Sequence, residues 1–248
     1  MLKATIYFML YLIGLGFDEK DITLKGIEAG KKCEKCYAEL YTSDWKGDIK
    51  NIEKLIGKEI KILERSDLEE NLDIWINEIK DYNTALFVPG DPLVATTHIA
   101  IVDQALRKGI KVKIIHAPSI ISAIASCGLQ IYKFGKTATI PWSGQVENVA
   151  KTIEFNKQHG LHTLLLLDIG MSGEQGLKIL LSKNIITEDT DIIVASNLGR
   201  ENEKILFCKA KEIKNFPSPC VIIIPGKLHF AEKEFLELLR CGNDRKRA

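Results

Sequence analysis

Short apolar runs typical of buried strands alternate with segments of helical periodicity along almost the whole chain. Residues 84–88 and 110–116 have the strand pattern, and residues 68–79 carry apolar side chains at helical spacing. Strands that alternate with helices need crossover connections, which favour parallel or mostly parallel sheets covered by helices on both faces. The chain is therefore predicted to belong to the α/β class.

The number of expected strands favours two domains over one. We expect roughly ten strands, and twisted open sheets seldom exceed about 10 strands, so two sheets are more plausible than one. A chain of 248 residues is long enough for either arrangement. The boundary is expected near residues 113–120, which gives predicted domains at 1–115 and 116–248.

Capping residues predict where several helices begin and end. Asp48 is well placed to cap a helix that Gly57 closes. Ser66, followed three residues later by Glu69, predicts a capping box. An amphipathic helix is expected over residues 230–240, followed by a polar tail.

Composition excludes several classes of protein. The chain has 34 Lys and Arg against 33 Asp and Glu, a net charge of +1, whereas a dedicated nucleic-acid binder is expected to carry a strong basic excess. The apolar run at 4–13 is too short to span a bilayer, and no small-residue cleavage site follows it. We therefore expect a cytoplasmic protein that binds neither nucleic acid nor membrane. Met9 is an alternative to Met1 as the start of the chain.

Of the six cysteines, only Cys33 and Cys36 form a CxxC pair, and no second pair or histidine pair completes a zinc site. Partly buried free thiols are the favoured interpretation. A disulfide or redox role is the less favoured alternative. The five histidines show no metal-ligand spacing, so no metal is expected.

Small, polar or turn residues follow five of the expected strands. In open α/β sheets, ligands bind beyond the carboxyl ends of the strands, so these segments predict a crevice built from both domains. The segments are Gly14-Leu15-Gly16, Pro89-Gly90-Asp91-Pro92, His116-Ala117-Pro118-Ser119, Asp168 and Pro225-Gly226-Lys227-Leu228-His229.

The common nucleotide and hydrolase motifs are absent. Glu19 stands where a dinucleotide fingerprint needs its third glycine, and Glu39, at a spacing suited to a ribose, does not restore that motif. The sequence contains no GxxxxGK[ST], GxSxG or HExxH. A nicotinamide oxidoreductase is therefore disfavoured.

Gly90 and Asp91 suit S-adenosylmethionine, which carries a sulfonium, an ammonium and ribose hydroxyls. Glycine allows close approach of the backbone, and the carboxylate offers an acceptor. A plain β-turn is the alternative for these residues, and composition alone favours it.

Six sequence blocks resemble the diphthine synthase family, within the tetrapyrrole methylase superfamily. The resemblance extends from about Met9 to the C-terminal helix, and the two longest blocks are specific. The blocks are GLGF at 14–17, YAELYTS at 37–43, PGDPLVATTH at 89–98, HAPSIISAIASCGLQIYKFGKTATI at 116–140, GLHTLLLLDI at 160–169 and PGKLH at 225–229.

The resemblance implies two α/β domains with S-adenosylmethionine in the cleft between them, and a homodimer. It also implies the substrate, a histidine of translation elongation factor 2 that bears an amino-carboxypropyl group. The amino group of that side chain would be methylated repeatedly to a trimethylammonium, giving diphthine. The cofactor contacts carried over by motif are Phe17, Asp91, Val94, Ser119, Ile120, Leu167, Leu198 and His229.

Several of these residues also have structural interpretations. Val94, Ile120 and Leu167 would be apolar in any such core, and Ser119 follows a proline that can open a helix. His229 can cap the last helix, and His98 is expected to be structural rather than a base. No catalytic base is assigned.

Two rival functions use the same fold or crevice. A methylase acting on a small tetrapyrrole is the nearest, and a non-catalytic protein that senses adenine nucleotides is the second. The YAELYTS and HAPSI blocks favour the protein substrate over the tetrapyrrole.

Overall fold

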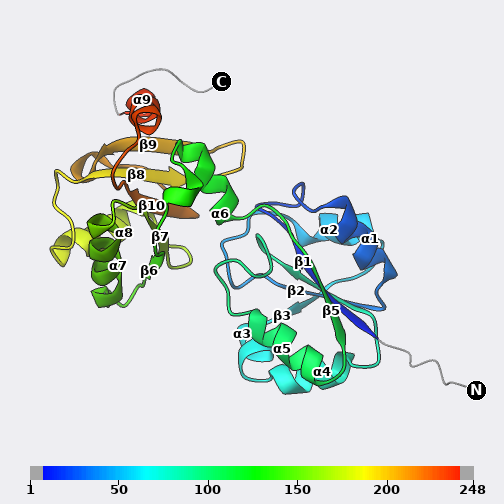
Figure 1. The fold of residues 1–248 in the computed structure, drawn as a ribbon. Helices are drawn as coiled ribbons and strands as arrows, with labels where there is room; N and C mark the ends of the chain where they lie inside the picture. The colour runs from blue at the N-terminus through cyan, green and yellow to red at the C-terminus, as the bar shows by residue number, and fades with distance from the viewer. Residues whose placement is uncertain (1–7, 241–248) are drawn as a thin grey trace, which may run out of the picture. The chain divides into compact units, whose positions relative to one another are not determined.

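The computed structural model describes residues 8–240, which fold into two compact units divided between Ile121 and Ser122 (Figure 1). Each unit contains one five-stranded sheet, as the strand count predicts. Cys241 and the polar tail, together with the expected strand start at Tyr7, lie outside the described residues.

The sheet of the first unit is entirely parallel, which confirms the α/β prediction for this half of the chain. Its strand order is β3-β2-β4-β1-β5, and each neighbouring pair runs in the same direction. The strands are β1 (Met9–Gly14), β2 (Lys35–Glu39), β3 (Lys61–Leu63), β4 (Thr84–Val88) and β5 (Lys111–Ile115).

Helices cover both faces of this first sheet because its strands alternate between two apolar cores. Leu10 and Leu12 of β1 pack against one group of helices, α3, α4 and α5, whereas Ile13 packs on the other face against α1 and α2 (Figure 1). The helices are α1 (Leu24–Lys32), α2 (Ile49–Ile56), α3 (Arg65–Glu69), α4 (Leu72–Ile79) and α5 (Ile99–Arg107).

The sheet of the second unit is mixed. Its order is β6-β7-β10-β8-β9, and among the neighbouring pairs of this described sheet only β6 and β7 are parallel. The expectation of mostly parallel strands is therefore correct for the first sheet and not for the second. A short connection makes β8 and β9 an antiparallel hairpin, and β10 returns antiparallel between β7 and β8. The strands are β6 (Ala138–Ile140), β7 (Thr163–Leu167), β8 (Asp191–Ser196), β9 (Lys204–Lys209) and β10 (Cys220–Ile224).

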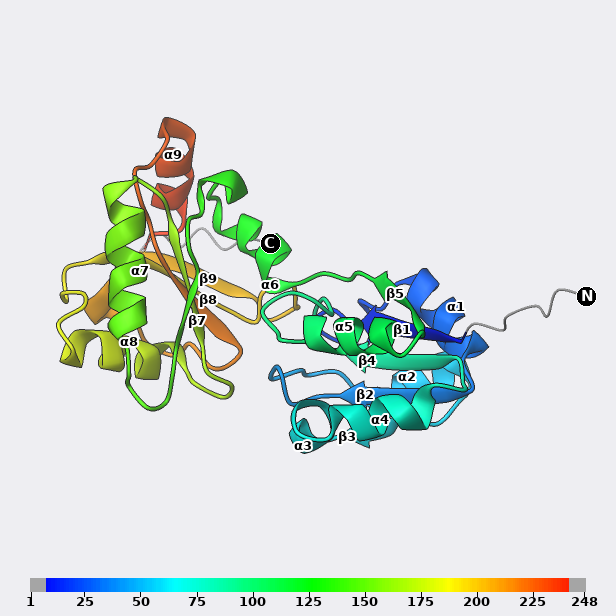
Figure 2. The ribbon, with the colours of Figure 1, turned by 60° about the horizontal axis from the view of Figure 1, so that its bottom comes forward.

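Helices α7 and α8 form an apolar core with one face of the second sheet (Figure 2). Val149 of α7 and Leu177 of α8 are buried in this core. The helical segments are α6 (Ile120–Ala123), which straddles the division, α7 (Glu147–Gln158), α8 (Gly173–Ser182), α9 (Phe230–Leu238) and three 3-10 turns, η1 (Ile124–Cys127), η2 (Ile131–Lys133) and η3 (Ala210–Glu212).

The helix caps follow the sequence signals with one exception. Asp48 accepts a hydrogen bond from the Lys50 N–H at 2.8 Å, and Gly57 ends α2 in the left-handed conformation, as predicted. The predicted box at Ser66 is wrong: the box is formed two residues earlier by Glu64 and Asp67, and the carboxylate of Asp67 accepts from the Glu64 N–H at 2.8 Å. Across residues 8–240, none of the helices combines the length and apolar character needed to cross a bilayer.

Candidate functional site at the carboxyl edge of the first sheet

The candidate site lies where the chain leaves two adjacent strands in opposite directions. From β1 the chain enters α1 on one face of the sheet, and from the neighbouring β4 it enters α5 on the other face. Such a point leaves room for a ligand beyond the carboxyl ends of the two strands. The glycine-rich loop after β1 and the loop at 89–98 both begin here.

Three loops come into close contact at this edge. The Gly90 N–H donates to the Gly16 carbonyl at 2.8 Å, and the Gly16 N–H donates to the Gly90 carbonyl at 3.1 Å. A Cβ added at Gly14 would lie 2.6 Å from the Cβ of Ala117 and 2.6 Å from the Gly90 carbonyl oxygen. The loops after β1, β4 and β5 can therefore meet only because Gly14 carries no side chain.

Gly90 has a left-handed backbone and an open side. Its φ is +64°, which disfavours residues with a side chain, and a Cβ built there would meet no atom within 4 Å. The space beside Gly90 is therefore available for a ligand that approaches the backbone closely.

Asp91 is buried and oriented by two hydrogen bonds. Its Oδ1 accepts from the Leu93 N–H at 3.1 Å, and its Oδ2 accepts from His116 Nδ1 at 2.7 Å. The side chain of Asp91 is 7% exposed, whereas that of His116 is 70% exposed. Each carboxylate oxygen can accept a further hydrogen bond, so Asp91 keeps acceptor capacity for a ligand.

The other predicted residues of the first unit lie on the same three loops. Phe17 follows the bridge at Gly16, and its N–H donates to Asp21 Oδ2 at 2.9 Å. Val94 closes the turn that begins at Asp91, since its N–H donates to the Asp91 carbonyl at 3.2 Å. Ser119 is buried, and Ile120 opens α6. The five predicted residues of this unit thus follow β1, β4 and β5: Phe17, Asp91, Val94 and Ser119 lie on the loops, and Ile120 is the first residue of α6.

The second unit separates its three predicted residues. Leu167 ends β7, and Leu198 follows β8, which runs in the same direction as β7. His229 follows β10, and β10 is antiparallel to both strands. His229 therefore lies at the opposite edge of this sheet from Leu167 and Leu198. The expected gathering of all strand ends at one edge fails here because the direction of β10 is reversed.

His229 acts as a helix cap, in agreement with its alternative interpretation. Its Nδ1 accepts from the Ala231 N–H at 3.4 Å, and its own N–H donates to Glu232 Oε2 at 2.7 Å. The preceding turn is anchored nearby, because the Gly226 N–H donates to His162 Nδ1 at 2.9 Å.

Glu232 is the centre of a buried network that holds this turn. It is 2% exposed and accepts from Lys133 Nζ, from the Gln130 N–H at 2.9 Å and from His162 Nε2 at 3.1 Å. Because Nδ1 of His162 accepts from Gly226, Nε2 carries the proton that it donates to Glu232. Burial opposes ionisation of Glu232, but the bonds from Lys133, the backbone and His162 outweigh it and lower its pKa to about 2.

The cysteine pair is structural. Cys33 and Cys36 are free and buried, which confirms the favoured interpretation. Burial, with a smaller contribution from the neighbouring Cys36, raises the pKa of Cys33 to about 12. A thiol with such a pKa is almost entirely protonated and is a poor nucleophile. Within residues 8–240, no cluster of three or more His, Cys, Asp or Glu side chains is arranged to hold a metal ion.

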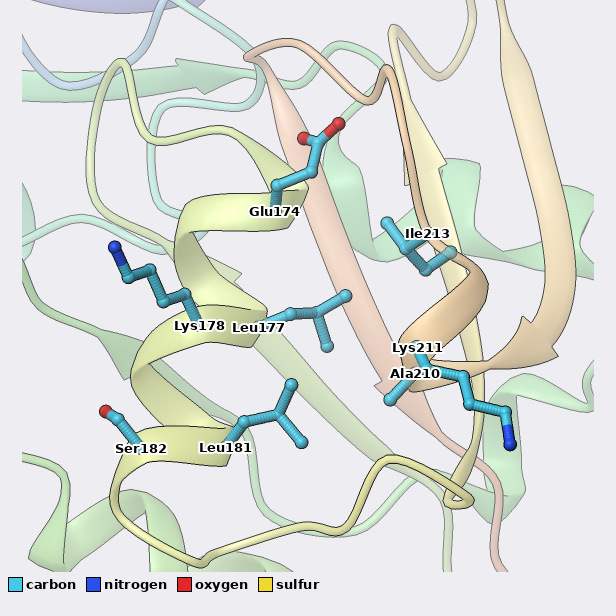
Figure 3. A pocket seen from close by; sticks show the side chains of 8 residues that line it. All are labelled: Glu174, Leu177, Lys178, Leu181, Ser182, Ala210, Lys211 and Ile213. Atoms are coloured by element: carbon cyan, nitrogen blue, oxygen red, sulfur yellow. The ribbon is translucent and has the colours of Figure 1, made fainter.

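A groove of about 480 Å³ on the second unit lies apart from all the predicted residues. Leu177 and Leu181 of α8 face Ile213 across it, with Lys178 and Lys211 at its rim (Figure 3). It is open and mostly apolar, and Glu174 contributes a carboxylate to its lining.

Sequence reasoning missed two features of the first unit. His116 was recognised at a strand end but was not assigned to the site, although it donates to Asp91. The buried contact of Glu39 with His98 was also missed, since these residues are far apart in the chain. For His116 the signal was its position directly after a strand. For the other pair no local signal exists.

Comparison with known proteins identifies the class. The family model described as Tetrapyrrole (Corrin/Porphyrin) Methylases matches residues 9–214. The match covers more than half of the chain, so the chain belongs to this family of methylases.

Individual relatives narrow the class. A diphthine synthase of Methanocaldococcus jannaschii is 43% identical over 95% of this chain and 100% of its own length, and one of Methanococcus aeolicus is 42% identical over 95% and 99%. A solved structure, described as the crystal structure of diphthine synthase, has a TM-score of 0.87 and 37% identity, with 94% of this chain and 96% of that chain covered. The chain belongs to the diphthine synthase family.

Proposed function

We propose that the protein transfers methyl groups from S-adenosylmethionine to the amino group of a modified histidine on translation elongation factor 2. The acceptor is the amino-carboxypropyl side chain of that histidine, and the product is diphthine, in diphthamide biosynthesis. Membership of the diphthine synthase family over nearly the whole chain is the observation that carries this proposal.

The chemistry of the first unit's carboxyl edge supports S-adenosylmethionine as the methyl donor. Gly90 leaves space for close approach, and the buried Asp91 carboxylate offers acceptors for ribose hydroxyls or an ammonium group. Val94, on the next turn of the same loop, supplies apolar surface. The remaining proposed contacts are Phe17, Ser119, Ile120, Leu167, Leu198 and His229.

The donor supplies an activated methyl group, because its sulfonium carries a positive charge. The protein's task is then to align an amine with that methyl group, and alignment can be worth about 7–11 kcal/mol. Asp91 is suited to this task because Leu93 and His116 hold both of its oxygens in place. The amine must be neutral when it attacks, so its proton leaves before the transfer.

The proposal includes a homodimer in the cytoplasm. The dimer is what the resemblance to diphthine synthases implies, and the cytoplasm follows from the proposed substrate, because an elongation factor is a cytoplasmic protein. The measurement of molar mass by light scattering tests the dimer directly, and a monomer at all concentrations would contradict it.

The function is tested with elongation factor 2 that carries the unmethylated intermediate. We expect mass spectrometry to detect methylation of that histidine only when the enzyme and S-adenosylmethionine are both present. A folded enzyme that binds the donor but transfers no methyl would contradict the proposal and favour a nucleotide sensor. Methylation of a tetrapyrrole but not of the elongation factor would favour the other rival.

A further inference from the structure

A carboxylate is buried beside the loop at 89–98. Glu39, the last residue of β2, is 0% exposed. The next turn of the chain wraps around it: its Oε2 accepts from the N–H groups of Tyr41 and Thr42, each at 3.1 Å, and its Oε1 accepts from Thr42 Oγ1 at 2.5 Å. These three donors fix both oxygens and leave one direction of Oε1 open to a further group.

His98 occupies that direction. It is 3% exposed, and its Nε2 lies 3.7 Å from Glu39 Oε1 with no hydrogen-bond partner of its own. Its Nδ1 lies 3.3 Å from the carbonyl oxygen of Pro92. A carbonyl oxygen can only accept, so Nδ1 must carry a proton.

This tautomer determines the proton count of the pair. If His98 is neutral, its Nε2 presents a bare lone pair to Glu39, and the contact is favourable only when Glu39 is protonated. If His98 is charged, it faces a carboxylate as an ion pair. In both cases one proton lies between the two residues and the pair is neutral overall, which a buried position requires. Burial favours the neutral forms, since it raises the pKa of Glu39 and lowers the pKa of His98.

Glu39 and His98 are connected through the backbone to residues 89–94, the loop proposed to bind the methyl donor. His98 stands at the N-cap position of α5 without a side-chain capping bond, and its ring reaches back to Pro92, which directly follows Asp91. Between them, Ala95 has a φ of +56°, a left-handed conformation that is unfavourable for a residue with a side chain. Strain of this kind persists only where the surroundings hold it, and the contact from His98 to Pro92 closes the strained segment.

We propose that Glu39 and His98 hold one proton between them and thereby position residues 89–94 for the methyl donor, an inference that rests on the function proposed above. Neither side chain is exposed enough to touch the acceptor, so both are positioning residues. Loss of the shared proton sets a lone pair against a buried carboxylate, which pushes His98 away and releases Pro92.

Few other charged groups face this pair. Arg65 and Glu69 of α3 act on Glu39 and His98 respectively, and they partly neutralise each other, with Arg65 Nε 3.8 Å from Glu69 Oε1. Burial raises the pKa of Tyr41 to about 12, so Tyr41 remains neutral at the pH values at which donor binding is measured. The shared proton is therefore the group expected to titrate here.

Three variants separate positioning from simple packing. We expect His98→Ala, which removes the hydrogen bond to the Pro92 carbonyl, and Glu39→Ala, which removes the group that faces His98, each to raise the dissociation constant for S-adenosylmethionine about tenfold. The kcat at saturating donor should change far less than KM. Glu39→Gln should rescue binding, because its oxygen is held by the Tyr41 and Thr42 N–H groups and its amide then donates to His98 Nε2.

The pH dependence gives a readout that packing alone would not change. In the wild-type protein, donor affinity should fall as pH rises and the pair loses its shared proton, while Glu39→Gln, which has no such proton to lose, should lack that component. The donor's own titration is common to both proteins and cancels in the comparison. Tyr37→Phe is the matched control. Tyr37 also lies on β2, and this variant removes only its hydrogen bond to Glu78, so neither the donor affinity nor its pH profile should change.

A readout without ligand keeps this inference separate from the proposed function. Hydrogen–deuterium exchange of residues 89–97 in the free protein should be faster in His98→Ala than in wild type, with far-UV circular dichroism unchanged. Unchanged exchange in this variant, or an identical pH profile in Glu39→Gln and wild type, would overturn the shared-proton pair. Failure of the wild-type protein to bind the donor would instead overturn the proposed function.

Discussion

Glu232 provides the sharpest test of how the second unit holds the turn at 225–229. Its pKa falls from the usual 4.5 to about 2 in the folded protein, which corresponds to about 3 kcal/mol of stabilisation when the group is ionised. Glu232→Gln keeps the shape but removes the charge that pairs with Lys133. We therefore expect the variant to lose about 3 kcal/mol of unfolding free energy at about pH 7.

The sign of the pH dependence follows from the lowered pKa. The stabilisation is complete above the unfolded pKa of 4.5 and is lost as pH falls toward 2. The difference in unfolding free energy between wild type and Glu232→Gln should therefore decrease at low pH. Urea unfolding measures this difference, and hydrogen exchange in α9 shows whether the destabilisation is local to that helix. Glu237→Gln, which changes an exposed residue of the same helix paired with Arg240, should change the unfolding free energy far less than Glu232→Gln does. Equal effects of the two variants, or a difference that does not decrease in acid, would refute the reasoning.

Three further predictions concern the first unit. Asp91→Ala should weaken binding of S-adenosylmethionine in calorimetry about tenfold or more without loss of fold. Asp103→Ala, at an exposed position, should leave binding unchanged. Normal affinity in a folded Asp91→Ala protein would show that Asp91 does not bind the donor. Gly90→Ala and Gly57→Ala, which share a positive φ and open surroundings, should each cost about 1 kcal/mol of stability, but only the former should lower donor affinity. Cys33 should resist alkylation in the native protein at about pH 8, and rapid labelling of its peptide by mass spectrometry would contradict a buried thiol.

The fold of the first unit could be predicted from the sequence because the patterns that determine it are local. Alternating strand and helix patterns imply crossovers, and crossovers make β1, β4 and β5 parallel. Turn residues at their carboxyl ends must then gather at one edge, which is where the structure places Gly90 and Asp91. The short strand β3 escaped prediction because it has only three residues, and two of their side chains are exposed.

The second unit was less accessible because an apolar run does not encode its direction. Cys220 to Ile224 reads as a buried strand in either orientation, and the sheet pairs it antiparallel with both neighbours. His229 was therefore expected beside Leu167 but lies at the other edge. The contact of Glu39 with His98 was hidden for a different reason, since only the tertiary fold brings residues so distant in the chain together.

The central claim is that the methyl donor lies against the loop at 89–94. A crystal structure of the protein with S-adenosylmethionine tests it most directly. We predict density for the donor beside Gly90, with a polar group of the donor hydrogen-bonded to the Asp91 carboxylate. Well-defined donor density that makes no contact with this loop would contradict the account.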